Sequence, residues 1–157
     1  MPQQTEKQKY PTSIRPEKTA ELMAQTGLSE DVLRQLVHEF YGKVRQDDLL
    51  GPIFAAGVSD WTAHLEKLTD FWSSVALMTG KYHGQPMQAH MKLKVQARHF
   101  SRWLELFRET ANTVCTPEGA KLVIARATII AGAISSNITD VNDDIGLGST
   151  PPNLKGV

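Results

Sequence analysis

The sequence lacks the features that identify several functional classes of protein. It contains one cysteine, Cys115, so no disulfide can form within it, and 17 basic and 17 acidic residues leave no net charge at pH 7. Without an excess of basic residues it lacks the electrostatic footprint of a nucleic-acid-binding protein. No stretch reaches the roughly 18–20 consecutive apolar residues of a membrane span, and residues 1–18 lack the apolar core of a signal peptide. We therefore expect a cytoplasmic protein that binds neither nucleic acid nor membrane.

Common catalytic motifs are absent as well. The sequence has no Gly-rich phosphate loop, no H-E-x-x-H or G-x-S-x-G motif and no C-x-x-C pair. Its aspartates and glutamates fall on the polar faces of predicted helices, where solvated carboxylates are expected. A length of 157 residues suits one domain with one core. The histidines remain as candidates for chemistry.

Apolar residues recur at three- and four-residue steps, which predicts an all-α fold. Four long helices are expected. The first follows Ser29, which would cap it. The others run from Trp61 to about Thr79, from about Val95 to Val114, and from a cap at Thr116 to about Asn137.

Shorter elements and the chain ends follow from the same pattern. A short helix over 19–25 is expected to stop at Gly27, and Pro52-Ile53-Phe54 reads as an apolar corner too short for a full helix. Residues 1–17 are polar and contain prolines, and residues 139–157 are rich in Gly, Pro and Asp, so we expect a disordered leader and tail. One domain at 18–138 would lie between them.

The stretch Gly80–Leu93, GKYHGQPMQAHMKL, interrupts the helical pattern with two glycines and a proline. Pro86 suits a first helical position, which predicts a very short helix to about Met91 whose distinctive side chain is His90. So short a helix is not stable by itself. An imidazole bound to a metal or cofactor would hold it in place.

Two of the five histidines stand out. His38 and His83 read as surface residues, and His99, one turn from Trp103, is ambiguous. His64 lies on the apolar face of an aromatic-rich helix; alone, it could equally be a core histidine bonded to backbone. His90 alone could be a surface residue at a helix start.

Together, His64 and His90 could lie on opposite sides of a flat group, because a helix and a turn separate them. Haem needs one axial imidazole, an apolar slot and hydrogen-bond donors on its open side. Tyr41 and Trp103 could supply an O–H and an N–H. The aromatic residues at helical spacing could also simply pack in the hydrophobic core, with no role in binding a cofactor. No C-x-x-C-H motif is present, so haem would be held non-covalently.

A series of short motifs carries a family resemblance. In order they are Phe40-Tyr41, Leu50-Gly51-Pro52-Ile53-Phe54, Trp61-x-x-His64, Phe71-Trp72, Gly80-x-Tyr82-x-Gly84-x-Pro86-x-x-x-His90, His99-Phe100 and Trp103-Leu104-x-Leu106-Phe107. This order and spacing, from about Ser29 to Asn137, resembles the truncated haemoglobins, most of all their third group. The resemblance implies a shortened globin fold, in which two antiparallel helix pairs cross around haem b and the proximal helix is about one turn long.

The resemblance also implies roles for individual residues. His90 would be the proximal iron ligand, and Tyr41, His64 and Trp103 would line the distal pocket. The other residues implied or suggested around the cofactor are Phe54 on the haem face, Leu68 and Trp72 behind the distal residues, Phe100 as a wall near the proximal side, and Lys67, Tyr82 and Arg98 as candidate propionate partners.

The expected function is binding of O2, NO or CO on haem iron opposite His90, for oxygen binding or transport. Three donors, Tyr41, His64 and Trp103, exceed what simple storage needs, so a redox enzyme is the alternative: nitric oxide dioxygenation, nitrite reduction or peroxidase-like chemistry. That enzyme would need a reductase, because no flavin or nicotinamide motif is present. His64 could also bind the iron and make the resting state six-coordinate. A haem-free helical interaction domain is the third possibility.

Overall fold

A computed structural model describes residues 15–84 and 95–144, with side chains described up to residue 136. All regular structure within these ranges is helical, as predicted. The helices are α2 (Pro16–Thr26), α3 (Glu30–Gln46), α4 (Gly51–Gly57), α5 (Trp61–Leu77), α7 (Ala97–Val114) and α8 (Pro117–Asp144). The short helix expected at Pro86–Met91, and His90 with it, lies outside the described residues.

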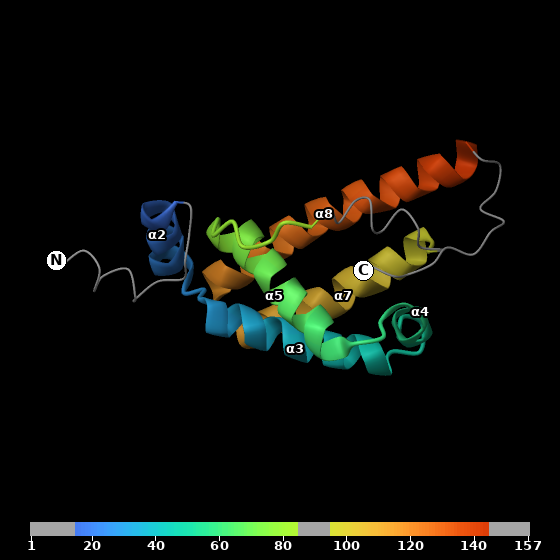
Figure 1. Cartoon of the computed structure of the whole chain (residues 1–157), viewed down its shortest axis with the longest axis horizontal. Helices are drawn as coiled ribbons and strands as arrows, with labels where there is room; N and C mark the ends of the chain where they lie inside the picture. Colours follow the sequence, from blue (N-terminus) through green and yellow to red (C-terminus); the bar gives the residue numbers. More distant parts are fainter. Residues whose placement is uncertain (1–14, 85–94, 145–157) are drawn as a thin grey trace.

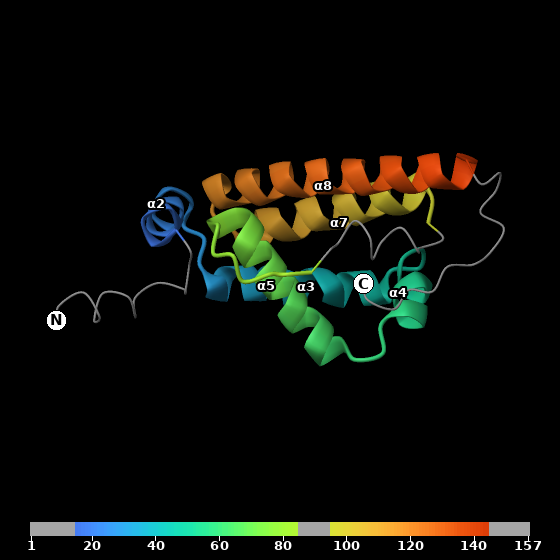
Figure 2. The ribbon, with the colours of Figure 1, turned by 45° about the horizontal axis from the view of Figure 1, so that its top comes forward.

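The long helices form two antiparallel pairs. Helices α7 and α8 run side by side, joined by a tight turn, and α5 crosses α3 in the other pair (Figures 1 and 2). The two pairs are joined because α3 also packs against α7 and α5 against α8. Helix α2 closes one end of the molecule, against α5 and α8. This arrangement is the two-over-two helical sandwich of a shortened globin.

Aromatic side chains fill the contact between the two pairs. Phe107 of α7 is the centre: its ring lies 5.1 Å from Phe40, 5.0 Å from Trp72 and 5.4 Å from Trp103, measured between centroids. Phe40, Trp72 and Phe107 are almost completely buried. Each such side chain contributes about 1.5–3 kcal/mol by leaving water. This cluster fixes how α3, α5 and α7 cross, and so positions every side chain discussed below.

Side-chain caps set the helix starts, and the caps predicted at Ser29 and Thr116 are confirmed. Ser29 accepts a hydrogen bond from the Val32 N–H (3.2 Å), Asp60 from Ala63 (3.1 Å) and Thr116 from Gly119 (3.0 Å). Each cap satisfies a backbone donor that the first helical turn leaves free. Helix α2 ends at Gly27, whose φ of 72° is the left-handed conformation that glycine adopts easily.

Three boundaries differ from the prediction. The apolar corner at Pro52-Ile53-Phe54 is a helix, α4, because Pro52 suits its first turn and the Asp47 carboxylate accepts the preceding Leu49 and Leu50 N–H groups. Helix α8 continues through residues 139–144, where a disordered tail was expected to begin, since extending an existing helix adds one hydrogen bond per residue. Helix α2 begins at Pro16, inside the expected leader.

Helix α8 has the length and average hydropathy of a membrane span, although Lys121 and Arg126 interrupt its apolar residues. Its segment Pro117–Ser136 is long enough and apolar enough, with a mean hydropathy of 1.3. Core helices pass the same test, and α8 packs Ala120, Val123, Ala127 and Ala131 into the protein core. Of the segment Pro117–Ser136, 33% is buried, so packing in the core accounts for part of its apolar composition.

Candidate functional site

Helices α3, α5 and α7 bring three of the predicted site residues together. Tyr41 on α3 and His64 on α5 have ring centroids 6.1 Å apart, edge to face, and both side chains are buried. Trp103 on α7 makes a side-chain hydrogen bond with Tyr41. The three residues are far apart in the sequence, and the aromatic core around Phe40 and Phe107 sets their approach.

The Trp103–Tyr41 hydrogen bond has a defined direction. An indole has an N–H donor and no acceptor, so Trp103 donates and the Tyr41 oxygen accepts. The Tyr41 O–H proton is then left to donate elsewhere. The sequence had offered Trp103 as an independent donor, but here its N–H is directed at Tyr41.

Burial raises the pKa of Tyr41 to about 12, although the hydrogen bond from Trp103 lowers it in part. Removing a phenolate from water is costly, so the neutral form is favoured. Tyr41 is therefore a protonated hydroxyl donor throughout the physiological pH range.

Aromatic rings surround this polar group. Phe54 on α4 lies 5.7 Å from the Tyr41 ring, and Trp61 lies 6.1 Å from Tyr41 and 5.5 Å from His64. The Arg45 guanidinium lies over the Trp61 ring, 4.5 Å from its centre, in a cation–π contact that was not predicted. The rings keep water from this side of Tyr41, where a hydrogen bond to a ligand is stronger than in water.

Helix α5 presents two different apolar faces. Thr69, Trp72 and Ala76 are buried against the rest of the core, with Trp72 only 2% exposed. Leu68, Phe71 and Val75 follow His64 at helical spacing and are only partly buried. Trp72 stacks on Phe107 in the core, while Leu68, one turn earlier, packs half-buried against the same core.

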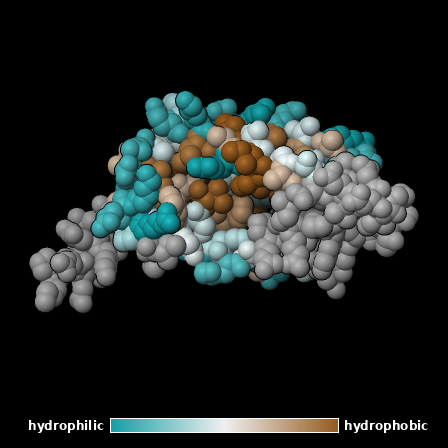
Figure 3. Space-filling view, turned by 90° about the horizontal axis from the view of Figure 1, so that it is seen from above, coloured by the Kyte–Doolittle hydropathy of each residue, from teal (hydrophilic) through white to brown (hydrophobic). Residues whose placement is uncertain are grey.

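A space-filling view from above shows apolar residues gathered near the middle of the molecule, bordered by hydrophilic ones (Figure 3). Partly buried Leu, Phe and Val side chains on one face of a helix are the kind of surface that a flat apolar group covers.

The chain that leaves α5 is held firmly as far as Gly84. The Tyr82 ring packs edge-on against Phe71, with centroids 5.1 Å apart, and the Tyr82 N–H donates to Ser74 (2.8 Å). Lys81 forms an ion pair with Glu30 at the start of α3. A Cβ at position 84 would lie 2.2 Å from the Tyr82 hydroxyl oxygen, so glycine is required for this close approach. The Gly-x-Tyr-x-Gly motif is thus explained by packing.

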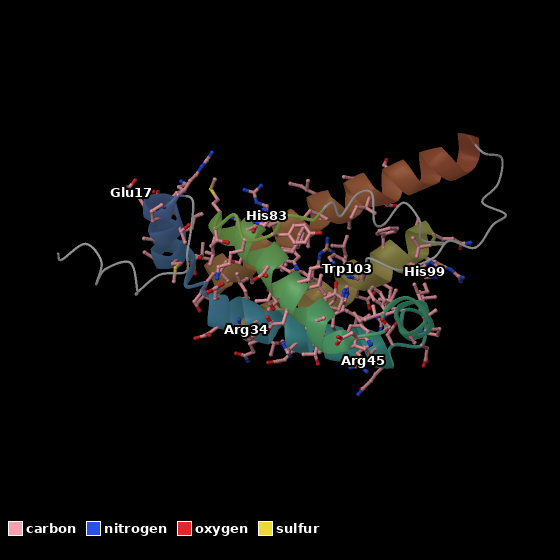
Figure 4. The ribbon with its side chains drawn as sticks, viewed as in Figure 1. Glu17, Arg34, Arg45, His83, His99 and Trp103 are labelled. Atoms are coloured by element: carbon pink, nitrogen blue, oxygen red, sulfur yellow. The ribbon has the colours of Figure 1, made fainter. Side chains whose placement is uncertain are left out.

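The other predicted site residues are more peripheral. Lys67 and Arg98 are exposed, and Phe100 is half-buried on α7. His38 and His83 are exposed, as expected, and the His99 Nδ1 accepts the Gln96 N–H (2.8 Å) as part of the α7 cap. Figure 4 shows Trp103 and His99 along α7, with His83 beyond the end of α5.

The described ranges 15–84 and 95–144 contain no group of three His, Cys, Asp or Glu side chains that could hold a metal ion. Haem iron needs only one protein ligand. The predicted ligand, His90, lies outside these ranges.

One partly buried ion pair next to Trp103 was not predicted from the sequence. Asp47, after α3, pairs with Arg102, the neighbour of Trp103 on α7. The two residues are 55 positions apart, and no local pattern links them.

Comparisons with known proteins agree with this geometry. Residues 22–135 match the bacterial-like globin family. The chain is 38% identical over 109 residues to a group 3 truncated haemoglobin, ctb, of Campylobacter jejuni, covering 66% of this chain and 86% of that protein. It also resembles the crystal structure of the group III truncated haemoglobin from Campylobacter jejuni, with a TM-score of 0.65, 36% identity, and coverage of 71% of this chain and 91% of that one.

The family match spans most of the described helices, including those that carry Tyr41, His64 and Trp103. With the two-over-two arrangement, it leads to one assignment: this chain belongs to the bacterial-like globin family and is similar within it to the group 3 truncated haemoglobins.

Proposed function

We propose that this protein binds haem b through His90 and holds a small diatomic ligand, O2, NO or CO, beside Tyr41 and His64. The family supports a haem-binding globin. The observation that carries the finer proposal is the buried Tyr41 hydroxyl group beside the buried His64 ring. Because Trp103 can only donate to its oxygen, we propose that the Tyr41 proton is donated to the ligand.

The described residues fit haem. A porphyrin needs an apolar slot, and α5 offers partly buried Leu68, Phe71 and Val75 in line with His64. Haem also needs few but well-placed polar groups on its open side, and Tyr41 and His64 are the buried polar side chains of the aromatic cluster. Phe54 would pack on the macrocycle. Exposed Lys67 and Arg98, and half-buried Tyr82, are the proposed propionate partners.

Haem iron, when bound, supplies reversible binding of diatomic gases and one-electron chemistry. The residues of this chain supply selectivity. A ligand that gains negative charge is stabilised by the Tyr41 O–H, and a neutral hydrogen bond of this kind contributes about 0.5–1.5 kcal/mol net. Phe54 and Trp61 exclude water around it. Such a site favours a polar, charge-accepting ligand such as O2 over CO.

A redox enzyme on the same cofactor is the second candidate, and the Tyr41–His64 pair favours it. A hydroxyl beside a buried imidazole can pass a proton to a ligand, as nitric oxide dioxygenase, nitrite reductase or peroxidase-like chemistry requires. Such a reaction would need an electron-donating reductase as partner. Rapid mixing of the oxygenated protein with NO separates the candidates: slow reaction counts against the dioxygenase.

Absorption spectroscopy of the full-length protein tests the main proposal. We expect a strong Soret band that shifts when the protein is reduced with dithionite and again when CO is added. Sharp low-spin bands in the reduced protein before CO would show that a side chain such as His64 already occupies the sixth position. A protein with no Soret band, even after added haem, would be a haem-free helical domain.

A further inference from the structure

Asp47 joins three helices through one carboxylate. Its Oδ2 accepts the Leu49 and Leu50 N–H groups (3.1 and 3.0 Å) that precede α4. Its Oδ1 accepts a hydrogen bond from the Nε–H of Arg102 on α7 (2.8 Å) and forms an ion pair with Nη2 of the same guanidinium (2.8 Å). The carboxylate itself follows the last turn of α3 and is 7% exposed. Asp47 therefore sets the relative positions of α3, α4 and α7.

These are the elements that surround the Tyr41 hydroxyl. Tyr41 is on α3, Phe54 of α4 lies against its ring, and Trp103 of α7 donates to its oxygen. Arg102 immediately precedes Trp103, so a shift of Arg102 along or away from Asp47 moves the Trp103 indole as well. A second ion pair between α3 and α7, Lys43–Glu109 (3.2 Å), is more exposed and touches no part of α4.

We propose that Asp47 and Arg102 are a positioning pair for the distal site: they hold α7 and α4 against α3 so that Trp103 meets the Tyr41 oxygen and the Tyr41 O–H is directed at the bound ligand. Neither residue touches the ligand. The proposal rests on the proposed function, because it concerns the same pocket.

The physical reason is the two-point attachment. Two nitrogens of one planar guanidinium lie 2.8 Å from the same Asp47 oxygen, so the guanidinium is held in orientation more closely than a single ammonium nitrogen would be. Without Arg102, the Asp47 carboxylate would be drawn toward water and would pull on the Leu49 and Leu50 N–H groups. Small misplacements of a hydrogen-bonding group in a buried site have large effects on what it binds.

The test compares full-length, haem-loaded variants of Arg102 with a matched ion-pair control. Arg102→Gln removes both the positive charge and the guanidinium group, and Arg102→Lys keeps only the charge. Lys43→Gln breaks the exposed ion pair between the same two helices. Because Arg102 also bonds Glu105 on its own helix, Glu105→Gln controls for that contact. The readouts are the C–O stretching frequency of the CO complex and the O2 dissociation rate.

We expect Arg102→Gln to shift or split the C–O stretch and to raise O2 dissociation about 2- to 5-fold, no more than Tyr41→Phe does, because the hydrogen bond is weakened and not lost. Arg102→Lys should fall between Arg102→Gln and the native protein. Lys43→Gln and Glu105→Gln should match the native protein. An unchanged stretch and rate in Arg102→Gln, or an equal change in Lys43→Gln, would overturn the proposal.

A second readout separates this proposal from the proposed function. The indole N–H resonance of Trp103, assigned with Trp103→Phe, is recorded by NMR on the CO complex or, if the chain takes up no haem, on the protein as purified. Arg102→Gln should move this resonance and speed its exchange with water, while Lys43→Gln should not. A chain without haem whose Trp103 signal responds in this way would refute the proposed function and keep the positioning role. A Trp103 signal that does not respond in a haem-binding chain would refute the positioning role and leave the proposed function intact.

Discussion

The indole of Trp103 donates its hydrogen bond to the hydroxyl oxygen of Tyr41, across the contact between α7 and α3. The Trp103 ring is also stacked on Phe107, with centroids 5.4 Å apart, so the donor cannot turn away without disturbing the core. Under the proposed function, Trp103 would act on a ligand through Tyr41, and Tyr41 would be the main donor to that ligand.

The hydrogen bond predicts strong coupling between the two residues. Tyr41→Phe should raise O2 dissociation about 2- to 10-fold, the loss of one net hydrogen bond. Trp103→Phe should have a smaller effect, because Tyr41 keeps its O–H. In the Tyr41→Phe background the Trp103→Phe change should have almost none, which a double-mutant cycle measures. Additive effects would show that Trp103 reaches the ligand directly.

His90 should be required for haem. His90→Ala removes the predicted iron ligand, so the purified variant should lose most of its Soret absorbance and recover it in part when imidazole is added. His83→Ala, which changes an exposed histidine near the end of α5, is the matched control and should keep its spectrum. Equal haem content in both variants would mean that another residue is the ligand.

Alkaline pH should destabilise the protein through Tyr41. Its pKa is raised from 10.0 to about 12 in the folded state, so above pH 10 the unfolded chain loses the proton first. The stability contributed by the neutral Tyr41 hydroxyl should therefore be complete below pH 10 and be lost as the pH rises toward 12. Urea unfolding measures this slope, which should be smaller in Tyr41→Phe.

Cys115 adds to the same slope, because burial raises the pKa of its thiol from 9.0 to about 11. Some pH dependence should remain in Tyr41→Phe for that reason. The double variant with Cys115→Ser should be the flattest of the three, and a slope unchanged by Tyr41→Phe would contradict the buried, neutral hydroxyl.

Two glycines should respond to alanine in opposite directions. Gly84→Ala places a Cβ 2.2 Å from the Tyr82 hydroxyl, so the Tyr82 ring must leave Phe71, at a cost of about 1–3 kcal/mol. Gly132→Ala, in α8, meets nothing within 4 Å and should stabilise by about 0.5–1 kcal/mol. Thermal unfolding of both variants checks the contrast. Equal effects would show that Tyr82 does not pack as described.

Local features of the fold could be predicted because their causes lie within a few residues of one another. The capping side chains Ser29, Asp60 and Thr116 bond N–H groups three positions later, and spacing alone reveals them. The short helix α4 was not predicted because part of its cause lies far away in the sequence. Its start depends on Asp47, which also bonds Arg102 on a distant helix.

The same division holds for the candidate site. The sequence by itself determined an all-α chain with His64 on an apolar face and a motif order shared with truncated haemoglobins. The tertiary structure decided which groups are donors: it turned the Trp103 N–H onto Tyr41, moved Trp72 into the core against Phe107 and paired Arg102 with Asp47. Hydrogen bonds and ring contacts depend on distances between helices, and packing of the whole core sets those distances.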